Sequence, residues 1–275
     1  MKQFPTKTER HYYQVNLYEK IASHLQDLGF DLDNVKREDI ATVDEFHVRG
    51  AQVSKELAET VEIRGSKVLD VGCGIGGPCR MLADEYGCDV TGIDLSEEYT
   101  RTASKLSELV GLSSKIKFIH GDATNLPFEE MVFDVVWTQH VQMNINDKLK
   151  FYSEIERVLV DKGVFLYYDI LKTGNENINY PVPWADEQQI SFLATENEIE
   201  KILRDLNLKK IKVKDQTHNG ILFFEKMIDR IQKFGPPKIG LNLLMGESTQ
   251  TKIVNLLSGL KEGKLMLQSG VYKKV

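Results

Sequence analysis

The sequence predicts a doubly wound α/β fold, in which helices cover both faces of a mostly parallel sheet. Short apolar segments typical of buried strands alternate along the chain with amphipathic segments typical of helices. The connections between successive strands are long enough for a helix to return the chain to a parallel neighbour, and such crossovers are almost always right-handed. The first apolar segment ends in a glycine-rich turn, which is typical of sheets that bind a ligand at the carboxyl ends of their strands.

The glycine-rich turn belongs to residues 67–77, KVLDVGCGIGG. Its apolar residues, interrupted by Asp70, predict a buried strand, and a helix is expected to begin near Pro78. Glycine lets backbone N–H groups approach a ligand closely, and a helix N-terminus favours a carboxylate or phosphate. We interpret the turn as a nucleotide-type binding loop; the alternative is a strand-to-helix turn of the kind that also occurs without a ligand.

Two further strands each end in a carboxylate. Residues 88–94, CDVTGID, end in Asp94, and residues 116–123, IKFIHGDA, end in Asp122 and Ala123. An acid at the end of the second strand suits hydrogen bonding to both hydroxyls of a ribose. Because the carboxyl ends of parallel strands meet at one edge of a sheet, we expect the turn and both acids to form a single site.

The remaining core elements follow in order along the chain. Continuous apolar residues at 133–138 predict a fourth strand that is covered on both faces and runs into Gln139 and His140. Polar residues just past a buried strand are candidates for ligand contacts. The other expected elements are crossover helices at 78–86 and 97–110, helices at 46–59, 147–159 and 196–206, and strands at 163–170, 208–215 and 265–272.

A helical cap at residues 1–45 is expected to precede the main domain at 46–275. The charged, turn-prone residues 27–44 predict a loop within this cap. Two stretches, 171–194 and 216–262, depart from the regular alternation and are expected to form lids over the ligand-binding edge, the alternative being surface excursions. One cap helix is predicted by residues near helical spacing, namely Tyr12, Tyr13, Leu17, Tyr18, Ile21 and Leu25.

Composition excludes several classes of protein. The 275 residues are 41% hydrophobic, which is ample for a core, and the net charge of −6 argues against a nucleic-acid partner. The three cysteines, Cys73, Cys79 and Cys88, show no metal-ligand spacing with histidines, so we expect no metal and a reducing compartment. No apolar run is long enough to cross a bilayer, and the N-terminal residues have no signal core. We therefore expect a soluble cytoplasmic protein without a membrane partner.

Five blocks of sequence together resemble the class I S-adenosylmethionine-dependent methyltransferases, in the order and at the spacing of that family. They are VLDVGCGIGG, GIDLS, GDATNLPF, FDVVWTQH and IERVLVDKGVFLYYDI, and the resemblance covers residues 46–215. The flanking DEFHVRG, YPVPWA and PPKIGLNLLMG segments look like those of small-molecule methyltransferases, including sarcosine/dimethylglycine-type and natural-product enzymes. The resemblance implies a Rossmann-like sheet of seven strands whose last strand is antiparallel.

The same resemblance implies roles for individual residues toward S-adenosyl-L-methionine and its product S-adenosyl-L-homocysteine. The backbone of the glycine turn would approach the methionine and ribose, Asp94 would bind the ribose hydroxyls, and Asp122 would accept from the adenine amino group. His47, Arg49 and Gly50 either face the carboxylate end of the cofactor or form a solvated helix start. The implied cofactor-binding residues are Gly72, Cys73, Gly74, Asp94, Leu95, Asp122, Ala123 and Gln139.

The expected reaction is methyl transfer to a small-molecule acceptor, for which the protein mainly aligns the nucleophile. An amine acceptor must be neutral and desolvated, whereas a hydroxyl or carbon acid needs a general base. His140 is the candidate base by its location; the alternative is that it only contacts the cofactor or orders its loop. Tyr13, Asn144 and Trp184 are the candidate substrate contacts, and a homodimer is possible.

Two other classes remain as alternatives. A nicotinamide-dependent oxidoreductase shares the glycine turn and the terminal acid, but residues 72–77 fit its G-x-G-x-x-G fingerprint only when counted from Gly72, and the GDA block has no role there. A cofactor-binding protein of the same fold, such as a cyclase or a scaffold, would keep the same cofactor residues without transferring a methyl group.

Overall fold

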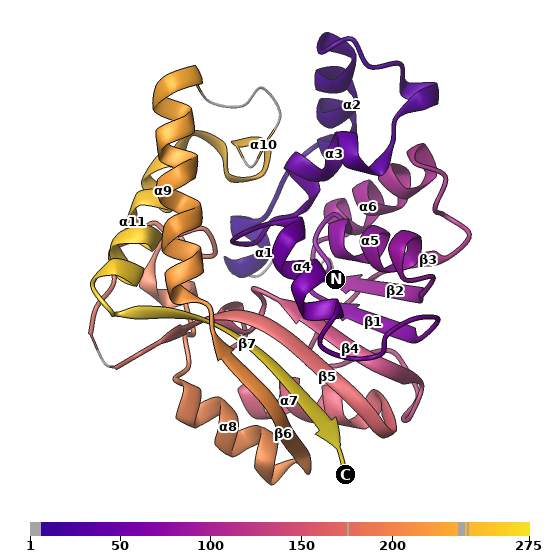
Figure 1. The fold of residues 1–275 in the computed structure, drawn as a ribbon, viewed down its shortest axis with the longest axis vertical. Coiled ribbons are helices and arrows are strands. Elements are labelled where there is room, and N and C mark those ends of the chain that lie inside the picture. The colour runs from indigo at the N-terminus through magenta and orange to yellow at the C-terminus, as the bar shows by residue number, and fades with distance from the viewer. Residues whose placement is uncertain (1–6, 175, 236–239, 241) are drawn as a thin grey trace, which may run out of the picture.

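The computed structural model describes residues 7–174, 176–235, 240 and 242–275, and it contains the expected seven-stranded sheet. The strand order is β3-β2-β1-β4-β5-β7-β6, in which β7 runs antiparallel to both of its neighbours and the pairings among β1 to β5 are parallel (Figure 1). The predicted fold class is therefore confirmed. The strands are β1 (Lys67–Val71), β2 (Asp89–Asp94), β3 (Ile116–His120), β4 (Phe133–Gln139), β5 (Leu159–Lys172), β6 (Leu208–Asp215) and β7 (Leu265–Lys274).

Helices cover the two faces of this sheet. Adjacent residues of β1 point to opposite faces, so Val68 packs in one apolar cluster and Leu69 in another. The cluster around Val68 includes residues of α4 and α5, and the cluster around Leu69 includes residues of α7 and α8. The five helices of the core are α4 (Ala51–Ala58), α5 (Gly77–Glu85), α6 (Glu97–Leu109), α7 (Lys148–Val158) and α8 (Glu196–Asp205).

The N-terminal segment differs from the prediction in two ways. The single aromatic helix is wrong, because Asn16 adopts a left-handed conformation (φ 55°) and separates α1 (Lys7–His11) from α2 (Leu17–Asp27). Tyr12 and Tyr13 lie in the break between them. The loop predicted at 27–44 is also wrong in part, because its last eight residues form α3 (Arg37–Asp44).

A hydrogen bond at its first turn explains why α3 forms in so polar a segment. The backbone N–H of Lys36 donates to Asp39 Oδ2 at 2.9 Å, which satisfies one of the donors that a helix start leaves free. The helix then buries Ile40 and Val43 against Leu17 and Ile21 of α2. The domain boundary expected at residue 45 stays a prediction.

The two predicted lid stretches take different forms. Strand β5 continues to Lys172, and after it the chain runs through a Val182–Ala185 bridge and a short 3-10 helix, Gln188–Ile190. The second stretch is mainly helical, with α9 (Thr217–Phe234), α10 (Asn242–Met245) and α11 (Thr249–Lys261); α9 and α11 lie side by side against β7 (Figure 1). Much of the PPKIGLNLLMG segment, residues 236–239 and 241, lies outside the described residues.

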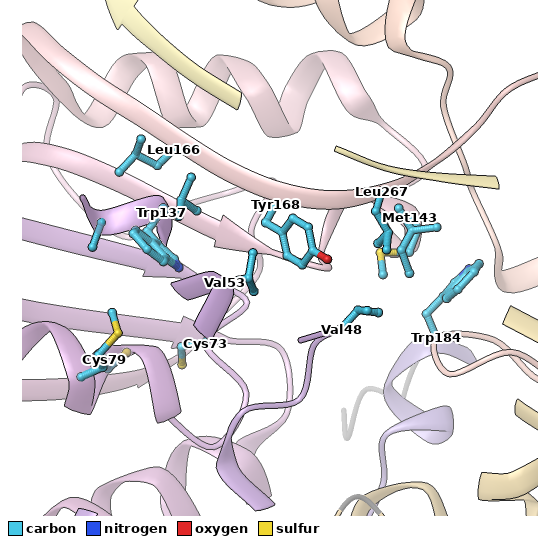
Figure 2. Packing of buried hydrophobic residues seen from close by; sticks show 14 of the residues in the cluster. Val48, Val53, Cys73, Cys79, Trp137, Met143, Leu166, Tyr168, Trp184 and Leu267 are labelled. Atoms are coloured by element: carbon cyan, nitrogen blue, oxygen red, sulfur yellow. The ribbon is translucent and has the colours of Figure 1, made fainter. Parts of the chain in front are cut away.

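The largest apolar cluster reaches from the sheet toward the lid stretches. Figure 2 shows Trp137 and Leu166 on the sheet, Tyr168 projecting from β5 beside Val53, and Trp184 of the first lid stretch farther along the same cluster. Trp137, Trp184 and Tyr168 are almost completely buried. Within the described ranges, no helix combines the length and the apolar character needed to span a bilayer.

Candidate active site

A cavity of 480 Å³ lies where the carboxyl ends of the central strands meet. Pockets of this size hold small ligands in many proteins. The structure brings together eleven of the residues singled out from the sequence; Tyr13 is 65% exposed and does not line the cavity. The lining residues that the sequence predicted are Gly72, Cys73, Gly74, Asp94, Leu95, Asp122, Ala123, Gln139, His140, Asn144 and Trp184.

The glycine turn after β1 is held against the end of β2. The backbone N–H groups of Gly72 and Cys73 both donate to the carbonyl of Ile93, at 2.7 and 3.1 Å. Gly72 has φ +76°, and a Cβ there would lie 2.4 Å from Val141 Cγ2, so no side chain fits. Gly74 has φ +54°, but a Cβ there would meet no atom within 4 Å. The backbone at Gly74 therefore borders open space in the cavity.

Asp94 lies at the end of β2 and receives two backbone hydrogen bonds. Its Oδ2 accepts from Gly74 N–H at 2.9 Å and its Oδ1 from Ser96 N–H at 2.9 Å. Burial raises the pKa of Asp94, and the two N–H donors oppose this shift. Each carboxylate oxygen has capacity for another donor, so the pair can accept from two neighbouring hydroxyls of a ligand.

Asp122, in the turn that follows β3, also lines the cavity. Asp122 Oδ1 accepts from both the N–H and the hydroxyl of Thr124 at 2.8 Å, which orients the carboxylate within its turn. A carboxylate held in this way can accept hydrogen bonds from an amino group of a bound base.

A buried polar network lies behind Gln139 at the end of β4. Ser54 Oγ lies 3.0 Å from His47 Nε2, 3.2 Å from Gln139 Oε1 and 3.3 Å from Glu45 Oε2. Trp137 Nε1 also donates to Gln139 Oε1 at 2.9 Å, whereas Gln139 Nε2 is buried without a partner in the described residues. Burial raises the pKa of Glu45 to about 8 and lowers the pKa of His47 to about 4, so both groups are uncharged near neutral pH.

His140 follows Gln139 in a conformation that side chains rarely adopt. Its φ is +54°, and its ring stacks on Tyr168 with the centroids 5.1 Å apart. His140 Nε2 and the Tyr168 hydroxyl are both buried without a hydrogen-bond partner among the described residues. Burial, with a contribution from His47, holds the pKa of His140 well below its usual range, so the imidazole is neutral near pH 7. Backbone strain at a cavity wall favours a functional role for this residue.

Three segments far apart in the sequence form the wall near His140. Tyr12 donates its hydroxyl to Asn144 Oδ1 at 2.9 Å, and Asn144 Nδ2 donates to the carbonyl of Trp184 at 2.9 Å. Trp184 Nε1 donates in turn to Ser191 Oγ at 2.9 Å. This chain of hydrogen bonds fixes the 3-10 turn Gln142–Asn144 that follows β4.

Sequence reasoning missed several residues of the cavity. Tyr12, rather than its neighbour Tyr13, lines it, and no spacing signal distinguishes two adjacent tyrosines. Asp70 also lines the cavity, and an acid inside an apolar strand is the sequence signal that could have identified it as a buried carboxylate. Cys79 Sγ donates to Asp70 Oδ2 at 3.1 Å, and burial raises the pKa of Asp70 to about 7. His47 lines the cavity, whereas Arg49 pairs with Glu56 and does not.

The chemistry of these groups is that of a site for binding and alignment. In the part of the chain that the structure describes, no cluster of three His, Cys, Asp or Glu side chains is placed to hold a metal ion. The cavity instead offers several carboxylates, among them Asp94 and Asp122, together with an open glycine backbone and neutral hydrogen-bonding side chains.

Comparison with known proteins gives consistent matches. Residues 69–167 match a family model described as a methyltransferase domain. A glycine/sarcosine/dimethylglycine N-methyltransferase of Actinopolyspora halophila is 31% identical over 212 residues, covering 76% of this chain but only 36% of that protein. A sarcosine/dimethylglycine N-methyltransferase of Halorhodospira halochloris is 30% identical over 194 residues, covering 70% of this chain and 68% of that protein.

A solved structure shares the fold. Geranyl diphosphate C-methyltransferase of Streptomyces coelicolor A3(2), crystallised with Mg²⁺, geranyl diphosphate and S-adenosyl-L-homocysteine, superposes with a TM-score of 0.67 at 15% identity. The superposition covers 82% of this chain and 79% of that one.

Proposed function

The chain belongs to the S-adenosylmethionine-dependent methyltransferases, and from this premise we propose that it transfers a methyl group from S-adenosyl-L-methionine to a small-molecule acceptor. The observation that carries the proposal is the meeting of the glycine turn, Asp94 and Asp122 in one cavity, at the ends of three neighbouring strands. This arrangement supplies acceptors for the ribose and the adenine, and an open backbone between them.

The residues present fit this cofactor. Asp94 would bind the ribose hydroxyls, Asp122 the adenine amino group, and the backbone at Gly74 faces space that no side chain fills. The unpartnered Gln139 Nε2 is a donor for a carboxylate or hydroxyl of the ligand. When bound, S-adenosyl-L-methionine supplies an electrophilic methyl group on a positively charged sulfur.

We propose that the acceptor nucleophile is an amine, with a hydroxyl as the alternative. Two of the relatives carry the name N-methyltransferase, which supports an amine. Tyr12, Asn144 and Trp184 would orient the acceptor, because their hydrogen bonds fix the wall beside His140. His140, which lines the cavity and whose Nε2 has no partner among the described residues, would accept the proton that the nucleophile loses. Aligning the acceptor is the main contribution of the protein.

The setting and assembly of the protein are also proposals. Three free, buried cysteines agree with a cytoplasmic location. A homodimer is proposed from the sequence. Sedimentation-velocity ultracentrifugation at micromolar protein concentration would test the proposal, and a sedimentation coefficient that corresponds to a monomer would contradict it.

Titration calorimetry with S-adenosyl-L-methionine and S-adenosyl-L-homocysteine tests the cofactor site. We expect binding of both compounds, and we expect Asp94→Ala to weaken it by about 1–3 kcal/mol because the ligand hydroxyls lose their acceptor. Asp89→Ala, at an exposed position that begins the same strand, is the control and should bind normally. Absence of binding at millimolar concentration would contradict the proposal. Binding without transfer of labelled methyl to any acceptor would favour a non-methylating protein of this fold.

His140→Asn tests the proton acceptor, because asparagine tolerates the left-handed backbone but cannot take up a proton. We expect kcat for methyl transfer to fall roughly 100-fold while the affinity for S-adenosyl-L-homocysteine changes little. His218→Asn, at an exposed position of α9, is the control. An unchanged kcat in His140→Asn would limit His140 to ordering its loop.

A further inference from the structure

The carboxylates that line the cavity are not balanced by lining cations among the described residues. Among the described residues that line it there is no lysine or arginine. The two lining histidines, His47 and His140, are held neutral by burial, because the pKa of each is lowered. Five aspartates line the same space: Asp44 is paired with Arg80, burial raises the pKa of Asp70 to about 7, and the others are Asp94, Asp122 and Asp147.

The two buried arginines, Arg49 and Arg80, are bonded to other groups of the protein. Arg80 is completely buried and pairs with Asp44 at 2.8 Å, while its remaining donors go to backbone carbonyls and a serine. Arg49 pairs with Glu56 and Gln216. Each of these guanidinium groups is thus directed to a fixed protein acceptor.

Lys148 and Lys252 are occupied in the same way behind the cavity wall. Lys148 Nζ donates to three backbone carbonyls of the loops that form that wall. Lys252 Nζ lies 3.1 Å from Asp186. Neither ammonium group lines the cavity, so the described lining residues offer no lysine or arginine to an anion bound there.

Outside the glycine turn, aromatic and apolar side chains form much of the cavity wall. Its hydrogen-bonding side chains, such as Asn144 and the Tyr12 hydroxyl, are uncharged and already bonded to each other. Apolar and aromatic lining residues are Phe46, Met143, Ile145, Pro183, Trp184 and Phe192, and the segment after Ile145 adds Asn146 and the carboxylate of Asp147. Burying a carboxylate or phosphate against such a wall costs several kcal/mol without a paired cation.

We propose that the methyl acceptor carries no permanent anionic group on the part that enters the cavity: it is a neutral or cationic small molecule whose nucleophile is attached to an apolar body. This inference rests on the proposed methyl transfer and narrows its substrate class. Sarcosine and dimethylglycine, for which two relatives are named, carry a carboxylate, and geranyl diphosphate carries a diphosphate. The acidic wall is compatible with the cofactor, because the sulfonium and the amino group together outweigh its one carboxylate.

A cysteine placed in the cavity measures this charge without any acceptor. In Ile145→Cys, the ratio of alkylation rates by neutral iodoacetamide and anionic iodoacetate reports the local potential, because the ionisation of the thiol affects both rates equally. Leu222→Cys, at an exposed position of α9 outside the cavity, is the matched control. Peptide mass spectrometry separates these sites from the three native cysteines, which are buried.

We expect the ratio at Ile145→Cys to exceed that at Leu222→Cys by about tenfold or more, since one carboxylate a few ångströms away has an effect of this size. Equal ratios, or a preference for iodoacetate in the cavity, would overturn the inference. The result does not depend on methyl transfer, so it separates failure of the charge argument from failure of the proposed function.

Matched acceptors test the consequence for the substrate. Sarcosine and sarcosinamide differ only in whether the carboxylate is present as its neutral amide, and both can be offered to the full chain with S-adenosyl-L-homocysteine bound. We expect sarcosinamide to bind at least about tenfold more tightly than sarcosine. In Ile145→Lys, which adds a cation to the wall, this preference should shrink, whereas Ile145→Met should keep it. Tighter binding of sarcosine by the unmodified chain would contradict the inference.

Discussion

At the scale of single residues, Gly72 and Gly74 serve the same turn for different reasons. Both have positive φ, but only a Cβ at Gly72 would strike a neighbour, Val141. A Cβ at Gly74 would enter the open cavity instead. A side chain at Gly74 would therefore meet no protein atom. Any loss of ligand binding on its substitution, beyond the cost of the left-handed backbone, would come from contact with the ligand itself.

The matched substitutions are Gly74→Ala and Gly87→Ala. Gly87 also has positive φ (+69°) and no atom within 4 Å of a Cβ, but it lies outside the cavity. Both variants should lose about 1–2 kcal/mol of unfolding free energy because alanine disfavours this backbone. Gly74→Ala alone should also weaken S-adenosyl-L-homocysteine binding, by about 1–3 kcal/mol, through overpacking against the ligand. Urea unfolding and calorimetry measure the two effects; equal affinities in both variants would show that the cofactor does not reach Gly74.

Asp70 predicts a dependence of stability on pH. The pKa of this carboxyl is 3.8 in its ordinary environment and about 7 in the fold, because burial disfavours the charged form. Between these values the folded state holds a proton that the unfolded state releases, so this group lowers stability as the pH rises through the window. Asp70→Asn removes the effect.

The stability gained by Asp70→Asn over the unmodified chain should therefore be larger at pH 8 than at pH 5, by about 2–3 kcal/mol. Urea unfolding of the ligand-free protein at the two pH values measures this difference. Asp89→Asn, at an exposed position of β2, serves as the control and should gain nothing. A gain for Asp70→Asn that does not change with pH would contradict the assigned burial effect.

At the scale of elements, Lys148 at the start of α7 joins two loops that border the cavity. Its Nζ donates to the carbonyls of Gln142 and Ile145 after β4, and to Phe192 of the first lid stretch at 2.6 Å. Burial lowers the pKa of Lys148 to about 8, and Asp169 opposes the shift. One ammonium group therefore links the loop after β4 to the first lid stretch and fixes their relative position.

Lys148→Met should free these loops and raise the KM for the acceptor several-fold, with a smaller change in kcat, because alignment of the acceptor is impaired while the cofactor site is intact. Leaving three carbonyls without their shared donor should also cost about 1–3 kcal/mol of stability. Lys150→Met on the same helix is exposed and should behave like the unmodified chain. An unchanged KM in Lys148→Met would exclude this role for the two loops.

At the scale of the whole molecule, the N-terminal elements share a core with the sheet domain. Leu17 and Ile21 of α2 pack in one apolar cluster with Ile75 of the glycine turn and Leu106 of α6. The buried Arg80 of α5 adds polar links, since it bonds to Asp44 of α3 and to carbonyls of the turn and of α6. These shared contacts predict that residues 7–45 unfold together with the rest.

Arg80→Met tests this coupling, because it leaves the Asp44 carboxylate buried without its cation. The expected loss is about 3–5 kcal/mol, seen in differential scanning calorimetry as one transition at lower Tm. The double variant Arg80→Met with Asp44→Asn removes both charges and should recover part of the loss. A separate early transition that leaves the main one in place would instead indicate an independently melting cap.

The sequence by itself determined the order of the elements, the parallel core and the residues of the proposed cofactor half of the site. These features follow from local patterns: the period of apolar residues defines each element, and glycines or acids at strand ends meet at one edge wherever strands are parallel. Strand 208–215 was predicted with the bounds that β6 has. The left-handed break at Asn16 and the capped start of α3 were not foreseen, because each depends on a backbone angle or a single hydrogen bond that leaves no period in the sequence.

Only the tertiary structure decided the acceptor half. Tyr12, Asn144 and Trp184 are separated by 132 and 40 positions, and no local pattern relates them. The partners of the cationic side chains are likewise not visible in the sequence. Only the fold shows that Arg49 pairs with Glu56 and that Lys148 donates to backbone carbonyls, rather than either binding a ligand. Such pairings are set by the packing of distant segments, because the free energy of a buried polar group depends on the partners that surround it.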